Sequence, residues 1–301
     1  MELRLNPAFF WPINSTIVRS LRFPVALWRE RALYRLLWRH APQRAIDRAV
    51  AHLLTPPAHR FPDDELRLME DASLVAVPMV PDRLIGWRWG RKQDPLVILV
   101  HGWGGRGTQL KAFIAPLLER GFSVIAFDAP GHGMTGGPDS SLPHFLRGLE
   151  AMLDHVGPAH ALIGHSLGGA VAALVMARRP EAARRGVLIA APASLEESTW
   201  RLAAALEWPP ALRAAVQRRI EYRFGVAWSE FEAGHRVGAQ DMLVIHDRQD
   251  REVPFAEALR HASTWPGARL FETTGLGHRR LLADAGVIGA ATEFVAAGVR
   301  P

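Results

Sequence analysis

From residue 72 onward, short apolar runs alternate with amphipathic stretches. The runs are three to six residues long, which is the length of a buried strand. We expect eight strands, at Ser73–Val77, Leu84–Trp89, Leu96–Val100, Ser123–Phe127, Ala161–Ile163, Val187–Ala190, Met242–His246 and Arg269–Phe271. Helices are expected between most of the later runs, at Leu110–Arg120, Pro143–Val156 and Gly168–Arg179.

This order of elements predicts an α/β fold. Near-continuous apolar strands that are separated by helices form a mostly parallel sheet with helices on both faces. The first two runs have no helix between them, so they predict an antiparallel edge. At 301 residues, the chain fits one large α/β domain with an insertion better than two equal domains.

The insertion is expected between Ala190 and Met242, where about fifty residues contain no good strand. This interval includes the break at Pro209-Pro210 and an arginine-rich helix at about Ala211–Phe224. We therefore expect a helical cap at about residues 191–240. An insertion at this point would lie over the carboxyl ends of the strands, where open α/β sheets bind ligands.

Residues 1–60 are expected to form a basic N-terminal segment, separate from the α/β domain at 61–301. Residues 24–54 are expected to be helical, with apolar side chains on one side and Arg31, Arg35 and Arg39 on the other, and Thr55-Pro56-Pro57 ends the helix. Such a segment could contact a membrane surface or a partner. The favoured interpretation is a helix packed on the catalytic body with a solvated arginine face, because any docked surface helix is amphipathic.

The distribution of charge and the absence of cysteine exclude some kinds of binding and chemistry. The net charge is +6, but residues 1–60 hold ten arginines against three acidic residues, so residues 61–301 carry −1. A general basic groove for nucleic acid is therefore not expected. The absence of cysteine excludes disulfides and thiolate chemistry and fits a reducing cytoplasm. We expect a cytoplasmic protein, with residues 1–60 as the segment for any peripheral contact with the inner face of a membrane.

The strongest chemical signal is Gly164-His165-Ser166-Leu167-Gly168, which lies where one apolar run gives way to another. This pattern is typical of a strand, a tight turn and a helix, with the Ser166 hydroxyl exposed on a strained backbone. A serine needs an adjacent base, and the base needs an acidic partner. Asp250 and His278 follow later strands in the order Ser, Asp, His, and the N–H groups of Trp103 and Leu167 are candidate donors to an oxyanion.

Other polar residues near these loops are given lesser roles. Asp247 is the rival of Asp250 as the acid. His165, His101 and His132 are expected to pack or to organise loops. The thirteen histidines show no metal-ligand spacing, and the glycine-rich loop after Val100 lacks the ending of a phosphate loop. No metal site is expected.

Taken together, these motifs resemble the α/β-hydrolase superfamily. The resemblance covers about residues 72–297 and rests on five landmarks in the family's order: His101-Gly102-Trp103-Gly104, Phe127-Asp128-Ala129-Pro130-Gly131-His132-Gly133, the Ser166 turn, Asp250 and His278. It implies an eight-stranded sheet, a cap after the sixth strand and hydrolysis without a cofactor. It also implies that Ser166 is the nucleophile, Asp250 the acid and His278 the base, with Trp103 and Leu167 as oxyanion donors.

The function expected from these residues is a serine hydrolase that cleaves a carboxylic ester or thioester of a small acyl compound through an acyl-enzyme. A serine at the turn argues against dehalogenase and epoxide-hydrolase chemistry, for which this superfamily uses aspartate. Peptide-bond hydrolysis, carbon–carbon-bond hydrolysis and acyl transfer remain alternatives on the same triad. From another class, a non-catalytic binding module remains open. The substrate and the oligomeric state stay undetermined by the sequence.

Overall fold

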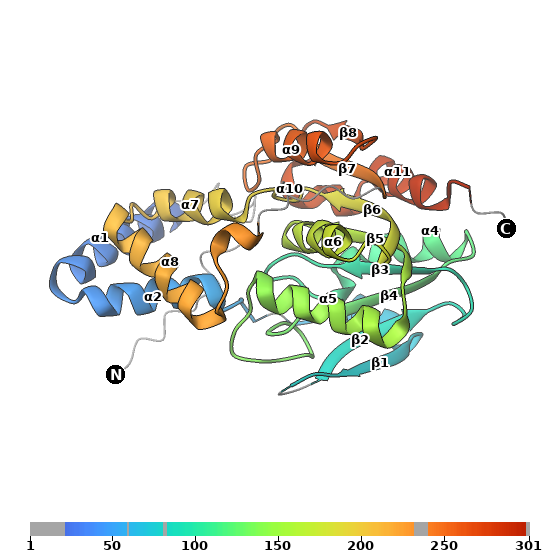
Figure 1. Ribbon diagram of the computed structural model, residues 1–301, viewed down its shortest axis with the longest axis horizontal. Coiled ribbons are helices and arrows are strands. Elements are labelled where there is room, and N and C mark those ends of the chain that lie inside the picture. Colours follow the sequence, from blue (N-terminus) through green and yellow to red (C-terminus); the bar gives the residue numbers. More distant parts are fainter. Residues whose placement is uncertain (1–21, 59, 81–82, 232–239, 299–301) are drawn as a thin grey trace. The chain divides into compact units, whose positions relative to one another are not determined.

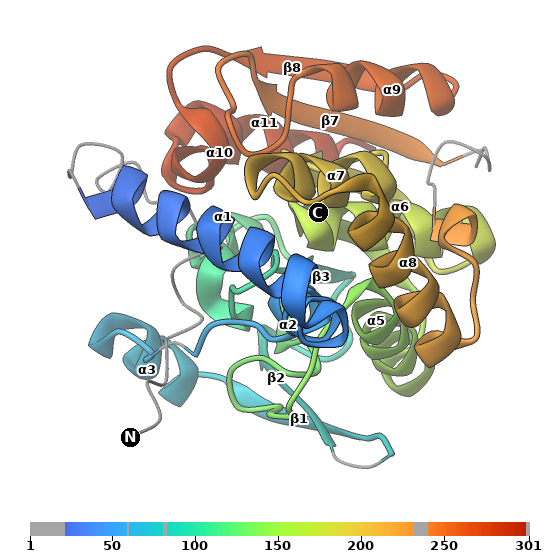
Figure 2. The ribbon, with the colours of Figure 1, turned by 90° about the vertical axis from the view of Figure 1, so that its left-hand side faces the viewer.

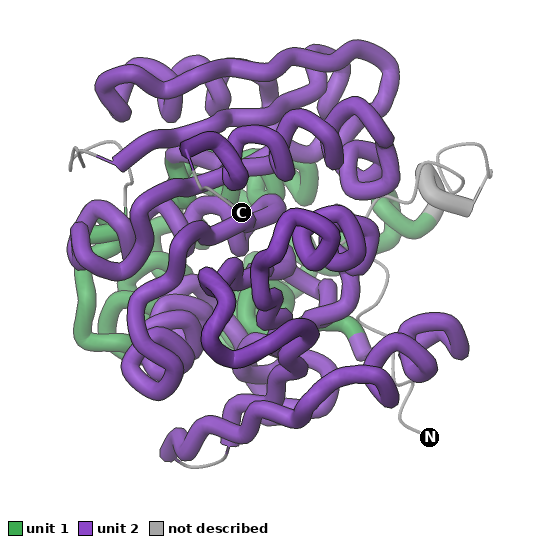
Figure 3. Tube along the Cα trace, turned by 90° about the vertical axis from the view of Figure 1, so that its right-hand side faces the viewer, with its two compact units in different colours: residues 1–57, 194–232 green, residues 58–193, 233–301 purple. Residues whose placement is uncertain are grey.

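The computed structural model describes residues 22–58, 60–80, 83–231 and 240–298. The chain divides into two compact units, each built from two separate stretches of sequence (Figure 3). We call residues 58–193 and 233–301 the sheet unit, and residues 1–57 and 194–232 the helical unit. The helical unit is therefore partly an insertion between the sixth and seventh strands.

The sheet unit contains one eight-stranded sheet in the order β1-β2-β4-β3-β5-β6-β7-β8 (Figure 1). Its strands are β1 (Ser73–Pro78), β2 (Arg83–Trp89), β3 (Leu96–Val100), β4 (Ser123–Asp128), β5 (Ala159–His165), β6 (Ala183–Ile189), β7 (Asp241–Asp247) and β8 (Arg269–Thr273). All eight expected strands are present. β1 pairs antiparallel with β2, and β2 pairs antiparallel with β4, whereas every other pair is parallel. The predicted antiparallel edge is confirmed.

Helices flank the sheet because its central strands are apolar on both faces. All five residues of β3 are buried. Val97 and Leu99 pack with the helical side chains Phe113 and Phe294 in one large core cluster. The helices of the sheet unit are α3 (Asp63–Glu70), η3 (Gly107–Phe113), α4 (Ile114–Leu118), α5 (Leu142–Val156), α6 (Leu167–Arg178), α9 (Ala256–Thr264), α10 (Gly277–Arg280), η6 (Leu281–Ala283) and α11 (Ala285–Ala296).

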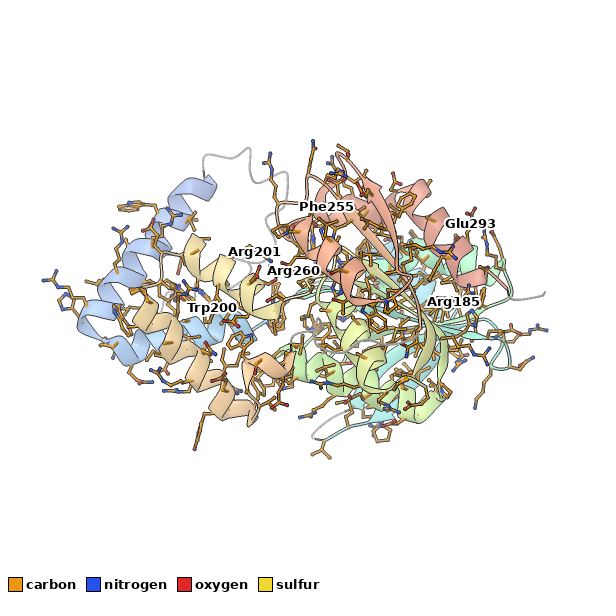
Figure 4. All side chains as sticks on the ribbon, turned by 45° about the horizontal axis from the view of Figure 1, so that its top comes forward. Arg185, Trp200, Arg201, Phe255, Arg260 and Glu293 are labelled. Atoms are coloured by element: carbon orange, nitrogen blue, oxygen red, sulfur yellow. The ribbon has the colours of Figure 1, made fainter. Side chains whose placement is uncertain are left out.

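The end of α11 is tied to the sheet by one arginine. Arg185 of β6 donates hydrogen bonds to the carbonyl oxygens of Phe294 and Val295, and its guanidinium lies 5.6 Å from the Phe294 ring centroid. Figure 4 labels Arg185 and, near it, Glu293 of α11. A cation at this position satisfies carbonyl groups that the last turn of a helix leaves without partners.

The helical unit contains α1 (Arg22–His40), α2 (Pro42–Leu54), α7 (Leu195–Ala205), α8 (Pro210–Phe224) and η4 (Trp228–Phe231), which Figures 1 and 2 show in two views related by a quarter turn. Its core joins the two stretches of sequence, because Tyr34 and Val50 pack with Trp208, Leu212 and Val216. Polar contacts also cross between them. Arg31 and Arg35 pair with Glu207, and Arg219 pairs with Asp47.

Three features of the fold, two in the helical unit and one in the sheet unit, differ from the elements expected from the sequence. The N-terminal segment 1–60 and the cap at about 191–240 were expected as separate parts, but their described helices share one core. Neither pair of helices can bury its apolar side alone, so they bury it against each other. Residues 24–54 form two helices, because Pro42 starts a new helix at its first turn. The expected helix at Leu110–Arg120 is a 3₁₀ helix followed by the short α4.

No helix among the described residues is long and apolar enough to cross a membrane. Residues 1–21 of the expected N-terminal segment lie outside the described residues.

Candidate active site

Ser166 lies at the turn between β5 and α6, as the sequence predicts. Its backbone has φ 53° and ψ −124°, a conformation that L-residues rarely adopt. The Ser166 N–H donates a hydrogen bond to the carbonyl oxygen of Ile189, at 2.9 Å, so β6 supports the turn. A strained residue that is held by its surroundings is a common feature of functional sites.

Close packing explains the glycines around Ser166. A Cβ on Gly164 would lie 2.4 Å from the carbonyl oxygen of Gly168, and a Cβ on Gly168 would lie 2.3 Å from the carbonyl oxygen of Val100. Real Cβ atoms do not approach backbone oxygens so closely. The two glycines therefore let the start of α6 contact both β5 and β3.

The loop that carries Trp103 passes directly against the serine. A Cβ on Gly102 would lie 3.0 Å from the Cβ of Ser166. The N–H of Gly104 donates a hydrogen bond to Nε2 of His132, at 2.9 Å, which fixes the far side of the loop. Leu167 begins α6, and the first N–H groups of a helix have no partner within it. The two candidate oxyanion donors thus belong to segments that adjoin Ser166.

Hydrogen bonds of His101 and His132 connect the Trp103 loop to the segment that follows β4. Nε2 of His101 accepts a hydrogen bond from the N–H of Ala129 at 3.0 Å, and its Nδ1 donates to the carbonyl oxygen of Gly102 at 2.7 Å. Burial lowers the pKa of His101 well below its usual range. Both ring nitrogens are therefore used in a neutral imidazole, and the expected loop-organising role is confirmed for His101.

Asp250 and His278 are brought together although they come from different loops. Nδ1 of His278 donates a hydrogen bond to Oδ2 of Asp250 at 2.8 Å. Oδ1 of Asp250 accepts hydrogen bonds from the N–H groups of Glu252 and Val253, at 2.8 and 2.9 Å. Burial acts to raise the pKa of Asp250, but hydrogen bonds from His246, His278 and the backbone outweigh it and lower the pKa below its usual range. Asp250 is therefore ionised and fixed against the imidazole.

Asp247, the rival acid, has a different set of partners. Its Oδ2 accepts hydrogen bonds from the Thr273 hydroxyl at 2.7 Å and from the N–H of Leu276 at 2.9 Å, and its Oδ1 accepts one from the N–H of Gln249. Burial would raise the pKa of Asp247, but these hydrogen bonds lower it. Asp247 thus joins the loop of Asp250 to the loop of His278, while Asp250 contacts the imidazole.

Two further histidines support the site. His165 is expected from the sequence to pack or to form a hydrogen bond, and it does form one, whereas no role for His246 is expected from the sequence. Nε2 of His165 donates a hydrogen bond to the carbonyl oxygen of His278 at 3.0 Å. Nε2 of His246 donates to the carbonyl oxygen of Val253 at 2.9 Å and lies 3.5 Å from Oδ2 of Asp250. The sequence offers one signal for the role of His246, which is a polar residue at the end of the apolar run Met242–His246. A polar side chain that is buried there needs hydrogen-bond partners.

Metal ligands do not gather in the part of the chain that the structure describes, where no three His, Asp or Glu side chains are grouped to hold an ion.

Known proteins resemble the chain across this region. The family model for the alpha/beta hydrolase fold matches residues 95–240. A serine hydrolase-like protein of Homo sapiens is 30% identical over 115 residues, which are 36% of this chain and 56% of that protein. A pimeloyl-[acyl-carrier protein] methyl ester esterase of Klebsiella pneumoniae is 31% identical over 185 residues, covering 59% of this chain and 63% of the esterase. The chain thus spans less than two thirds of either relative.

A solved structure extends the likeness over most of the fold. The Pyrococcus furiosus esterase Pf2001 superimposes with a TM-score of 0.58 at 20% sequence identity, covering 80% of this chain and 98% of the esterase. The fold that it shares with this chain is the eight-stranded, mostly parallel sheet flanked by helices. The matched family model and this shared structure show that the chain has the alpha/beta hydrolase fold.

Proposed function

We propose that this chain is a serine hydrolase that cleaves a carboxylic ester or thioester of a small acyl compound. The observation that carries the proposal is the Asp250–His278 hydrogen bond of 2.8 Å, on the same sheet edge as the strained turn of Ser166. Enzymes that catalyse acyl transfer use these groups: an aspartate paired with an imidazole base, and a serine nucleophile on a tight strand–helix turn.

In the proposed reaction, the Ser166 hydroxyl attacks the acyl carbonyl and His278 takes its proton at Nε2. Asp250 holds Nδ1 and stabilises the imidazolium that forms. The N–H groups of Trp103 and Leu167 donate hydrogen bonds to the oxyanion. Breakdown of the intermediate returns the proton to the leaving alcohol or thiol, and water then releases the acid by the same sequence of proton transfers.

The choice of an ester or thioester is supported by the chemistry of the named relatives. The Klebsiella protein and the Pyrococcus protein are both described as esterases. The helical unit contains one close aromatic pair, Trp200 and Trp228, whose ring centroids lie 5.5 Å apart, and Figure 4 labels Trp200.

A fluorophosphonate probe tests the proposal, because it labels only an activated serine. We expect labelling of the folded chain at Ser166 and no labelling of Ser166→Ala. Absence of labelling on folded wild-type protein would favour the non-catalytic binding module. A panel of acyl esters and thioesters of graded chain length, run beside peptide and carbon–carbon-bond substrates, then distinguishes the reactions open to the same triad.

We also propose that α1 makes a peripheral contact with an anionic membrane. Trp28 is 64% exposed and Leu36 is 58% exposed on this arginine-rich helix. Aromatic and aliphatic side chains beside arginines suit the headgroup region of a bilayer. Flotation with anionic vesicles should occur at low salt and be lost in Trp28→Ser/Leu36→Ser. Equal flotation of both proteins, or none, overturns this proposal.

A further inference from the structure

Glu252 lies on the opposite side of the His278 imidazole from Asp250. Its Oε2 is 4.0 Å from Nε2 of His278, while Oδ2 of Asp250 is 2.8 Å from Nδ1. The two acids are also linked by the backbone, because the Glu252 N–H donates to Oδ1 of Asp250 at 2.8 Å. One short turn, residues 250–253, therefore presents a carboxylate to each nitrogen of the ring.

Arg279 partly neutralises this second carboxylate. Its Nε lies 3.2 Å from Oε1 of Glu252, and its guanidinium also lies 3.4 Å from Oε2. Arg279 follows His278 directly in the chain, so the base and the cation belong to the same short helix. The Glu252 side chain is only 16% exposed, which leaves its charge less screened than that of a surface pair.

We propose that Glu252 is a positioning residue that stabilises the protonated form of His278 from its Nε2 side, and that Arg279 limits this effect. The proposal deepens the proposed function, on which it rests. A carboxylate about 4 Å from an imidazole favours the imidazolium, and a guanidinium that binds the carboxylate opposes it. The balance between them sets how readily His278 releases the proton to the leaving group.

Other charged and titratable groups also face the His278 ring. The variants in the test leave these groups unchanged. Asp250 lies at Nδ1, and His246 acts through Asp250 at 3.5 Å. The His165 ring lies tilted against the His278 ring, with centroids 4.8 Å apart, and is neutral because burial lowers its pKa to about 3. Glu252 and Arg279 are thus the pair whose charges can be altered without removing the Asp250–His278 hydrogen bond.

The test compares two charge-removing variants that should act in opposite directions. Glu252→Gln removes the negative charge, so the midpoint of the His278 imidazole titration should fall by about half a pH unit. Arg279→Gln removes the positive charge, so the midpoint should rise by a similar amount. The acid limb of the kcat/KM profile should move with the midpoint in each variant. Arg279→Lys, which keeps the charge, should restore most of the wild-type value.

Glu181→Gln is the matched control. Glu181 belongs to an ion pair with Arg179 just beyond the carboxyl end of α6, whereas Ser166 precedes the amino end of the same helix. Removal of this acid should leave both the titration and the rate profile unchanged.

Nuclear magnetic resonance of imidazole-labelled protein reads the titration without any substrate, with His278→Gln identifying the signal. A wild-type chain that hydrolyses no acyl substrate would therefore contradict the proposed function, while the titration would still report on Glu252. Unchanged midpoints in Glu252→Gln, or shifts of the same sign in Glu252→Gln and Arg279→Gln, overturn the inference. Thermal unfolding of each variant establishes that folded protein is compared.

Discussion

His165 and His278 are joined by a hydrogen bond of 3.0 Å from the His165 ring to the His278 backbone. The residue before the candidate nucleophile thus holds the main chain of the candidate base. His165 is buried, and burial lowers its pKa to about 3, so the neutral ring remains a single donor at Nε2 across the physiological range. This contact links the β5 turn to the loop after β8.

Loss of this donor should reduce activity through the position of His278. We expect His165→Leu to lower kcat/KM about tenfold, which is ~1.4 kcal/mol of transition-state stabilisation. His165→Gln can place an amide N–H near the same carbonyl and should recover part of the loss. Steady-state kinetics with a fluorogenic ester measures both. If glutamine and leucine are equally damaging, the hydrogen bond is not the cause.

Substitution of Ser166 should separate stability from activity. Glycine adopts positive φ without steric cost, so Ser166→Gly should raise the free energy of unfolding by about 1 kcal/mol. Ser166→Ala keeps the Cβ and the strain, so its stability should match the wild type. Both variants should lose hydrolysis. Chemical denaturation checks the difference, and equal stability of glycine and alanine variants would argue against strain at this residue.

The two neighbouring aspartates should respond differently to the same substitution. Asp250→Asn should lower kcat about 10⁴-fold with a folded protein, because an amide cannot hold the required imidazole tautomer. Asp247→Asn leaves one acceptor oxygen in place of two, so it loses either the Thr273 and Leu276 contacts or the Gln249 contact, and it should lower the free energy of unfolding by about 2 kcal/mol, with a smaller loss of rate. Rate and stability are measured for both variants. A larger loss of rate in Asp247→Asn than in Asp250→Asn would contradict the prediction.

Asp128 should give the protein a specific dependence of stability on pH. Burial raises its pKa to about 6, against the effect of hydrogen bonds from the N–H groups of Gly107 and Met134. Between the unfolded pKa of about 3.9 and the folded value, the folded state binds more protons, so this group's contribution to stability falls as pH rises.

The measurement compares the wild type with Asp128→Asn, which cannot titrate. The free energy of unfolding of the wild type, minus that of the variant, should decrease from pH 4 to pH 6 and then level off. Denaturation series at several pH values provide this difference, while shared effects from other groups cancel. A constant difference would mean that Asp128 does not titrate in this range.

Much of the sheet unit was predictable because its signals are local. The run Leu96–Val100 is apolar at every position, and the structure buries all five residues in a central parallel strand. The Ser166 turn was also predictable from the sequence, because glycines occupy the positions where a Cβ atom would collide with the backbone. The order of Ser166, Asp250 and His278 along the chain placed all three after strands, whose carboxyl ends share one edge of a parallel sheet.

The sequence by itself therefore determined the strands, the strained turn and the residue types of the candidate site. Only the tertiary structure decided that Asp250 rather than Asp247 contacts His278, that Glu252 faces the other ring nitrogen, and that α1 and α2 share a core with α7 and α8. Strand and turn signals depend on neighbours in the chain, whereas hydrogen bonds between loops and packing between helices depend on how distant segments meet in space.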